Sequence, residues 1–239
     1  RVGFGVIILD NFAIFLNVTI CGIGLLTVLL SVGNSERDHL PQGEYYSLML
    51  FSIVGMMLMG STRDLLVIFL ALEIMSLGVY VMTGIKRSSE AGAEAAFKYF
   101  LLGSFSSAFF LYGIALAYTV TGTVKLDELG MRVPSRALNP NILLVLAMVL
   151  LLVGFAFKVS AVPFHMWTPD VYEGAPTPIT SFFAAAPKIA ALALFMRVFL
   201  VPLGGMVEEW RQIVVVISVL SMALGAFAAI GQTNIRRLM

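Results

Sequence analysis

The sequence has little charge and very little cysteine or histidine. Only 12% of its 239 residues are charged, whereas a soluble domain has about 25%. Hydrophobic residues make up 59%, and the mean hydropathy is +0.96. The net charge of +1, without runs of like charge, excludes the basic surface that proteins use to bind nucleic acid. These deficits indicate an integral membrane protein that crosses the bilayer several times.

The shortage of metal-binding side chains excludes several kinds of chemistry. Cys21 is the one cysteine, so this chain alone forms neither a disulfide nor a thiolate site for iron–sulfur or zinc. His39 and His165 are far apart, and no metal, nucleotide or nucleophile motif is present. We therefore predict no metal, no bound cofactor and no catalytic redox centre in this chain, so that any redox chemistry belongs to a partner.

Long apolar segments predict an all-α bundle of about seven transmembrane helices in a single membrane domain over residues 1–239. The expected spans are residues 12–32, 45–61, 64–84, 93–120, 141–163, 177–200 and 212–231. Lys and Arg are shared equally between alternate connections, so the positive-inside rule does not orient the chain. Arg197 is near the end of its span and is expected to act as an interface anchor, and Asp10 borders a helix and is expected to have a mainly topological role. The start at Arg1 and the abrupt end indicate a fragment of a longer protein.

Four charged side chains lie inside the apolar segments, namely Glu73, Lys98, Lys158 and Lys188. Such a charge is costly at membrane depth unless a partner or a water-filled cavity receives it, so these residues predict a path for protons or ions. Glu73 and Lys188 fall near the middle of their spans, but Lys98 is close enough to an end for its side chain to reach the surface. Structural roles in helix packing remain open for each of them.

Pro163 is expected to kink or break the span over residues 141–163. It lacks a backbone donor and crowds the preceding turn, which frees carbonyl groups that protein or water must satisfy. Lys158 precedes it by about one turn, and broken helices form the central sites of many transporters. A proline kink used only for packing is the alternative. His165 follows the break and is either a proton relay or a hydrogen-bonded structural residue.

Polar residues accompany the embedded glutamate. Ser76 and Tyr80 share its helix face and are expected to give the carboxyl group of Glu73 hydrogen-bonding neighbours. Gly103 and Ser107 form a small-xxx-small pattern that favours close contact with another helix.

These positions permit a proton relay. Moving Glu73 toward or away from Lys158 would change the proton affinity of the lysine, and separating the pair would favour release toward Lys188 through ordered water. This hypothesis depends on Glu73 and Lys158 forming a pair.

Several segments resemble the antiporter-like subunit N of respiratory complex I, a family that includes subunit two of mitochondria and its counterpart in chloroplasts. They are LLVIFLALEIMSLGVYV around Glu73, KYFLLGSFSSAFFLYGIALAYTVTG from Lys98, FKVSAVPFHMWTPDVYEGAPTPITSFFAAAPK from Phe157 to Lys188, and the ending GQTNIRRLM. The serine-rich run and FAAAPK favour the N type over the L and M types and over multisubunit sodium/proton antiporters, which share the glutamate and lysine positions.

The resemblance implies an antiporter-like fold with inverted repeats and a broken helix. It also implies a proton-translocating, non-redox membrane subunit of NADH:quinone oxidoreductase, with further helices before this chain and a second repeat after it. The family's functional residues would be Glu73, Lys98, Lys158 and Lys188.

The resemblance further implies partners and a location. The partners would be neighbouring antiporter-like and small membrane subunits together with lipids, and partner subunits would carry FMN and iron–sulfur clusters and use NADH and quinone. The location would be the bacterial inner membrane or an equivalent energy-converting membrane.

A cation/proton antiporter module and a non-transporting scaffold remain the alternative functions. Sodium-dependent exchange would favour the antiporter, and intact pumping without the charge of Glu73 would favour the scaffold.

Overall fold

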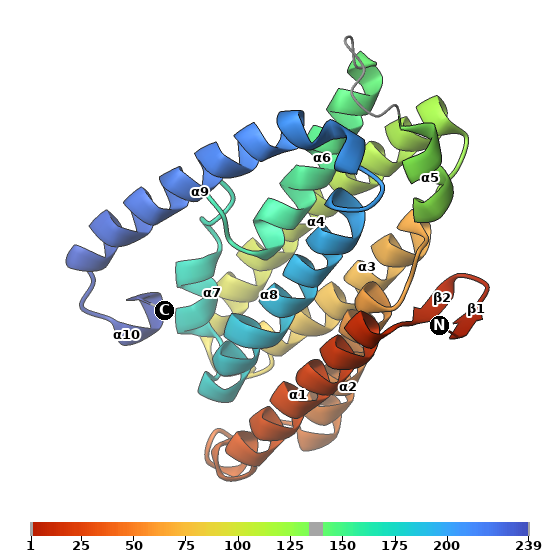
Figure 1. The fold of residues 1–239 in the computed structure, drawn as a ribbon. Helices are drawn as coiled ribbons and strands as arrows, with labels where there is room; N and C mark the ends of the chain where they lie inside the picture. Colours follow the sequence, from red (N-terminus) through yellow and green to blue (C-terminus); the bar gives the residue numbers. More distant parts are fainter. Residues whose placement is uncertain (1, 134–140, 239) are drawn as a thin grey trace.

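The chain folds as an α-helical bundle with a short β-hairpin at its start (Figure 1). The computed structural model describes residues 2–133 and 141–238. The elements before the helix break are β1 (Val2–Phe4), β2 (Ile7–Leu9), α1 (Asn11–Arg37), α2 (Gln42–Gly60), α3 (Leu65–Thr83), α4 (Glu90–Thr121), α5 (Leu126–Arg132) and α6 (Ile142–Lys158). Those after it are α7 (Thr168–Gly174), α8 (Thr177–Phe199), the 3-10 helix η1 (Gly204–Met206), α9 (Val207–Ile230) and α10 (Ile235–Leu238). The all-α class expected from the sequence is confirmed.

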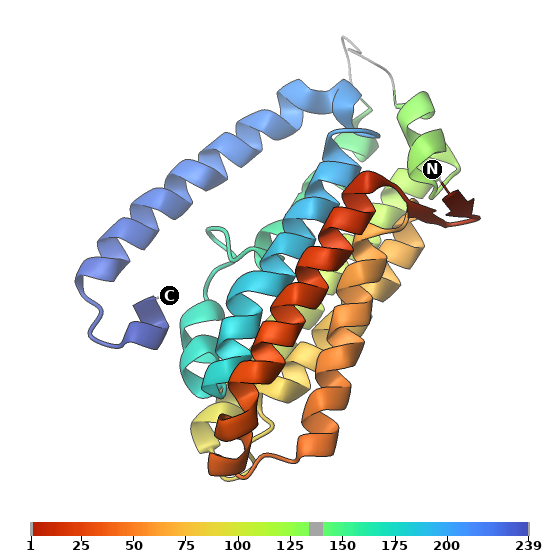
Figure 2. The ribbon, with the colours of Figure 1, turned by 60° about the horizontal axis from the view of Figure 1, so that its bottom comes forward.

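Six helices are long and apolar enough to cross a membrane, namely α1, α2, α3, α4, α8 and the run from η1 through α9. The apolar helix α6 has 17 residues. At about 1.5 Å per residue it is roughly 26 Å long, which is less than a hydrocarbon core of about 30 Å. In Figures 1 and 2 α7 follows α6 toward the other end of the bundle. It stays a prediction that all seven expected spans cross the bilayer.

Small residues let the central helices pack closely. A Cβ atom on Gly55 of α2 would lie 2.6 Å from the backbone nitrogen of Met75, and one on Gly78 of α3 would lie 2.3 Å from the hydroxyl oxygen of Ser52. Such contacts replace the hydrophobic driving force that helices lack in lipid. The result is a tight α2–α3 pair that fixes the face of α3 on which the polar residues lie.

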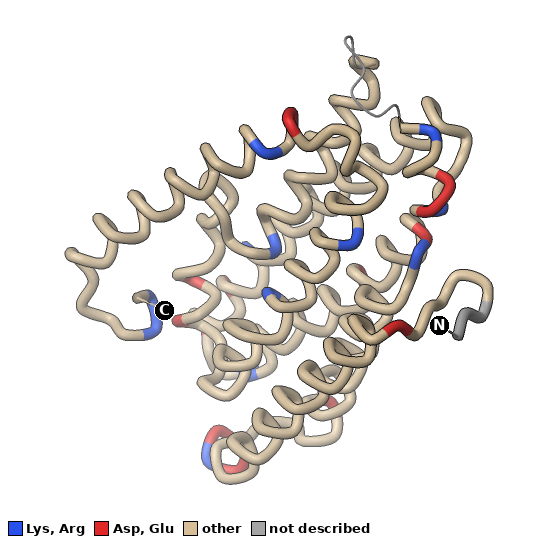
Figure 3. The backbone as a smooth tube through the Cα atoms, in the orientation of Figure 1, with Lys and Arg blue, Asp and Glu red and all other residues tan. Residues whose placement is uncertain are grey.

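The last long helix, α9, lies along the outside of the bundle (Figures 1 and 2). Trp210 is its one buried residue, although the helix is strongly apolar. After α9 the chain turns back, and α10 lies against α7. Most charged positions lie toward the ends of the bundle, and a few lie along the helices in its middle (Figure 3). The candidate site lies among these few.

Candidate functional site

The helix break begins at Lys158, earlier than Pro163. Helix α6 ends at Lys158, and Ser160 adopts a left-handed backbone conformation with φ +62°. The peptide bond between Val162 and Pro163 is cis. Because a proline also disfavours the helical conformation of the residue before it, the helix ends upstream of the proline itself. The expected span over residues 141–163 is therefore corrected to Ile142–Lys158.

Side chains satisfy backbone groups that the break exposes. The indole Nε1 of Trp167 donates to the carbonyl oxygen of Phe157 at 3.2 Å, and the backbone N–H of Val162 donates to Ser221 Oγ of α9 at 3.0 Å. The break is thus a built part of the fold, since polar backbone at membrane depth is tolerated where protein satisfies it.

Lys158 lies at the centre of the candidate site. Its side chain is buried, with 3% of the residue exposed, and its Nζ donates to Ser76 Oγ at 2.7 Å and to Tyr80 Oη at 3.3 Å. Both hydroxyls come from α3. The Tyr80 hydroxyl fits because α4 has Gly103 opposite it, where a Cβ atom would lie 2.0 Å from Tyr80 Oη. Three helices therefore define the position of one ammonium group.

Glu73 lies one turn before Ser76 on α3 and has a different partner. Its carboxylate accepts a hydrogen bond from the Ser107 hydroxyl of α4. The expectation that Ser76 and Tyr80 serve Glu73 is therefore wrong, because their hydroxyls bind Lys158. In residues 2–133 and 141–238 the carboxylate of Glu73 forms no ion pair with Lys158. The expected close packing of the Gly103–Ser107 face is confirmed, with α3 as the neighbour.

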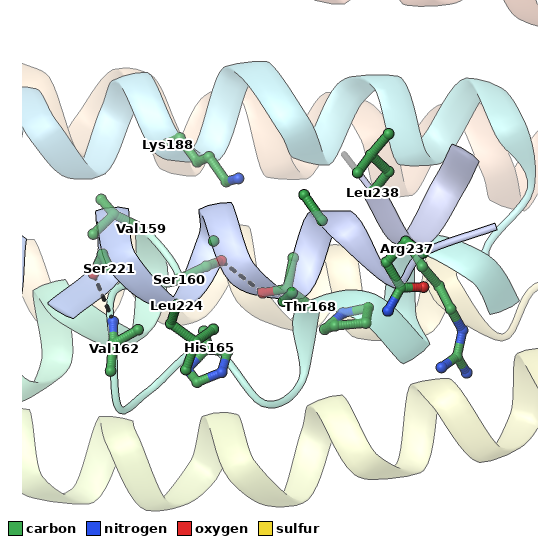
Figure 4. Close-up of a pocket in the computed structure, with 15 residues that line it drawn as sticks. Val159, Ser160, Val162, His165, Thr168, Lys188, Ser221, Leu224, Arg237 and Leu238 are labelled. Carbon is green, nitrogen blue, oxygen red and sulfur yellow. Dashed lines mark hydrogen bonds between the residues drawn. The ribbon is translucent and has the colours of Figure 1, made fainter. Parts of the chain in front are cut away.

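Lys188 borders a cavity of about 320 Å³ between α8, α9 and the connection after α6, and Figure 4 shows its Nζ pointing toward that space. Its Nζ lies 5.3 Å from the ring centroid of Tyr172. His165 lines the same cavity, and its buried Nδ1 has no hydrogen-bond partner in the described part of the chain. A cavity of this size, with Lys188 and His165 among its lining residues, has room for several water molecules, which such a nitrogen requires.

Lys98 lies apart from these residues. Its side chain is 44% exposed and forms ion pairs with Glu94 at 2.7 Å and with Asp170 at 2.9 Å. The structure thus places Lys158 in the interior, leaves Glu73 and Lys188 partly buried, and places Lys98 in a charged cluster near the start of α4. The position of Lys98 along its span indicated that its side chain can reach the surface, and its exposed ion pairs with Glu94 and Asp170 agree with that.

One ion pair was not anticipated. Arg197 of α8 holds Asp10 with Nη2 2.6 Å from Oδ1, and its Nε donates to the carbonyl oxygen of Gly60 at 2.7 Å. The guanidinium hydrogen bond keeps the pKa of Asp10 below its ordinary value even though burial acts to raise it. Arg197 was expected to be an interface anchor and Asp10 a residue that borders its helix, with no contact between them. Because they are 187 positions apart, no local sequence signal indicates their contact.

Among residues 2–133 and 141–238 the structure shows no group of three or more His, Cys, Asp or Glu side chains arranged to hold a metal ion.

Comparisons with known proteins agree with this architecture. A family model described as NADH:quinone oxidoreductase/Mrp antiporter, TM, matches residues 61–239. The NADH-quinone oxidoreductase subunit N of Trichlorobacter lovleyi is 46% identical over 233 residues, which are 98% of this chain and 48% of that protein. The subunit N of Rhodospirillum rubrum is 47% identical over 236 residues, with the same coverage. The chain thus spans about half the length of the curated relatives it matches.

Solved structures give the same result. A chain of the respiratory complex I from Thermus thermophilus with bound aureothin has a TM-score of 0.82 and 38% identity, covering 99% of this chain and 49% of that one. A chain of the Mrp complex from Dietzia has a TM-score of 0.81 and 26% identity, covering 96% of this chain and 42% of that one. Since the family match covers most of the chain and the relatives align along nearly all of it, the chain belongs to the NADH:quinone oxidoreductase/Mrp antiporter transmembrane family.

Proposed function

We propose that the chain is part of subunit N of an NADH:quinone oxidoreductase in a bacterial inner membrane, and that it moves protons through Glu73, Lys158 and Lys188. The names and identities of the curated relatives support the first part. The buried ammonium group of Lys158, held by two hydroxyls at the end of a broken helix, supports the second. A polar group so placed in a membrane helix is expected to have a function.

The partners of Lys158 suit a proton-transfer step. A hydroxyl both donates and accepts hydrogen bonds, so Ser76 and Tyr80 can serve the lysine whether it is protonated or neutral. A carboxylate in contact with the lysine would favour the protonated form strongly. Because the Glu73 carboxylate accepts a hydrogen bond from Ser107 instead, the relay hypothesis is revised: Glu73 lies one turn before Ser76, which binds Lys158, and protons pass by way of hydroxyls and water.

The other site residues flank this interior group. His165 lines the cavity beside Lys188, so it is proposed as an accessory proton carrier there. Lys98 is proposed to act near the membrane surface, where it pairs with Asp170 of the segment that follows the break.

The redox chemistry is assigned to partner subunits. Subunits that carry FMN and iron–sulfur clusters would take electrons from NADH and pass them to quinone, while this chain acts as a non-redox translocase. Neighbouring membrane subunits and lipids would cover its exposed apolar helices, of which α9 has the largest unburied share. The cation/proton antiporter alternative is supported by the Mrp match, which at 26% identity is weaker than the subunit N matches.

The test is redox-driven proton uptake by the whole complex, reconstituted in liposomes with the full-length subunit. Glu73→Gln is expected to lower NADH-driven proton uptake, while Glu44→Gln, which changes an exposed carboxylate in the first turn of α2, leaves it unchanged. Exchange of sodium for protons without NADH would instead support the antiporter. Unchanged uptake in assembled Glu73→Gln complex would support a scaffold.

A further inference from the structure

Lys188 differs from the other lysines in what its ammonium group contacts. The sequence has five lysines, and in four of them Nζ donates to a side-chain oxygen, namely Lys86 to Asp38, Lys98 to Asp170, Lys125 to Glu128 and Lys158 to Ser76. In residues 2–133 and 141–238 Lys188 forms no ion pair. Its Nζ lies over the ring of Tyr172, 5.3 Å from the centroid. At such a distance the negative face of the ring attracts an ammonium group.

The ring of Tyr172 is fixed by its own packing. The residue is 1% exposed, and its carbonyl oxygen accepts a hydrogen bond from Thr180 Oγ1 of α8 at 3.1 Å. Its ring meets that of Trp167 edge to face, with centroids 6.4 Å apart, and Trp167 stacks on Tyr99 of α4 at a centroid distance of 4.2 Å. Contacts with α4 and α8 therefore set where the ring lies, independently of Lys188.

The hydroxyl of Tyr172 does not account for this arrangement. Its oxygen is buried and has no hydrogen-bond partner in the part of the chain that the structure describes. A buried hydroxyl without a partner costs free energy, so it gives no reason for a tyrosine at this position. The ring face is the part of Tyr172 that contacts Lys188, and a phenylalanine ring has the same negative face.

The contact acts on one protonation state of the lysine. A ring face attracts the ammonium group but not the neutral amine, so it favours the charged form in a place that is partly buried. The other titratable side chains that border the cavity are His165 and Arg237. The guanidinium of Arg237 is held by the carboxylates of Asp170 and Glu173.

We propose that Tyr172 is a positioning residue that holds the protonated ammonium group of Lys188 against the face of its ring, beside the cavity. The proposal rests on the proposed function in one respect, since a proton retained at Lys188 serves translocation if this lysine carries protons. The same segment also contacts the other lysine site, because Trp167 donates to the carbonyl oxygen of Phe157, the residue before Lys158. The segment after the helix break thus has contacts at both lysine positions.

The test measures the charge state of Lys188 by its reactivity. A neutral amine attacks formaldehyde, a protonated one does not, and a borane reductant converts the adduct to methyllysine. The reaction is run at fixed pH on vesicles of the whole complex with the full-length subunit, and peptide mass spectrometry gives the rate at Lys188. Tyr172→Leu removes the ring and should raise this rate by about threefold to tenfold. Tyr172→Phe keeps the ring face and should leave the rate close to that of wild type.

A graded series separates the charge of the ring from its shape. Mono-, di- and trifluorinated phenylalanine at position 172 weaken the negative face step by step with little change in size, so the rate at Lys188 should rise with each fluorine. Tyr45→Leu is the matched control, because Tyr45 is also fully buried with an unpartnered hydroxyl but lies on α2. Neither that variant nor the exposed Lys125 should show a changed rate.

The outcomes are distinct. An unchanged rate in Tyr172→Leu overturns the proposal, as does a rise in Tyr172→Phe equal to that in Tyr172→Leu. Should Tyr172→Leu not assemble, the fluorinated series decides alone, and a flat series overturns the proposal. Normal pumping in Glu73→Gln would defeat the proposed function while a graded series still stood, whereas a flat series with impaired pumping in Glu73→Gln would defeat the role of Tyr172 alone.

Discussion

Lys158 and Lys188 lie in contrasting surroundings. Lys158 is enclosed by α3, α4 and α6, and two hydroxyls contact its ammonium group. Lys188 is only partly buried and faces a cavity large enough for water. The contrast shows two surroundings for a charge inside an apolar segment, namely fixed hydroxyl groups at Lys158 and a cavity with room for water at Lys188. We infer that Lys158 is a fixed step of the path and that Lys188 exchanges protons with water.

The largest expected effect comes from removing the enclosed lysine. Lys158→Met should lower redox-driven proton translocation by about 100-fold, a loss typical of removing a proton-transferring group. The measurement is the initial rate of NADH-driven acidification in vesicles, with subunit content checked. The exposed lysine variant Lys125→Met is the control and should be unchanged.

The second prediction uses chemical rescue to compare the surroundings of Lys158 and Lys188. Both Lys158→Ala and Lys188→Ala should pump poorly, but added methylamine should restore about a tenth or more of the rate to the Lys188 variant, since its cavity admits a small cation beside water. The Lys158 position should stay inactive because that residue is buried, with 3% of it exposed. Equal rescue at both positions would show that the two surroundings do not differ in the way inferred.

A third change disturbs the Lys158 site without touching its charge. In Gly103→Ala the new Cβ atom would lie 2.0 Å from Tyr80 Oη, so the tyrosine has to move away from the lysine. Losing one hydrogen bond to a charged group should slow translocation by about tenfold. Gly22→Ala, where a Cβ atom meets nothing within 4 Å, is the matched control. Full activity in Gly103→Ala would contradict a role for Tyr80.

The smallest functional effect is expected far from both lysines. Asp10→Asn removes a charge-assisted contact with Arg197 and should lower the free energy of unfolding by about 2 kcal/mol, while translocation per folded complex stays normal. The check is the apparent Tm in detergent.

The pH dependence of this pair has a defined sign. Because the folded-state pKa of Asp10 lies below its ordinary value of 3.8, the stabilisation is complete above that value and is lost as pH falls through the lowered pKa. Wild type and Asp10→Asn should therefore become equally stable in strong acid. Asp127→Asn, at a more exposed ion pair, should change Tm less.

Much of this arrangement could be predicted from the sequence. Helix positions follow from apolar length, and the unusual placement of Glu73, Lys158 and Lys188 is visible because charge is rare in such segments. What could not be predicted was the partner of each charge. Ser76 and Tyr80 share a helix face with Glu73, but the faces that α4 and α6 present decide which group their hydroxyls contact.

The end of α6 illustrates the same limit. Pro163 indicated a break, but the turn at Ser160 and the hydrogen bond from Val162 to Ser221 of α9 set where it begins. Contacts between distant segments, such as Asp10 with Arg197, depend on the packed bundle, and no local pattern encodes them.

The most direct test of the account is the number of protons moved per electron pair by the assembled complex containing Glu73→Gln and Lys158→Met together. The account predicts a lower ratio than in wild type, because the interior charges of this chain are needed to move its protons. An unchanged ratio, with normal subunit content and electron transfer, would contradict it.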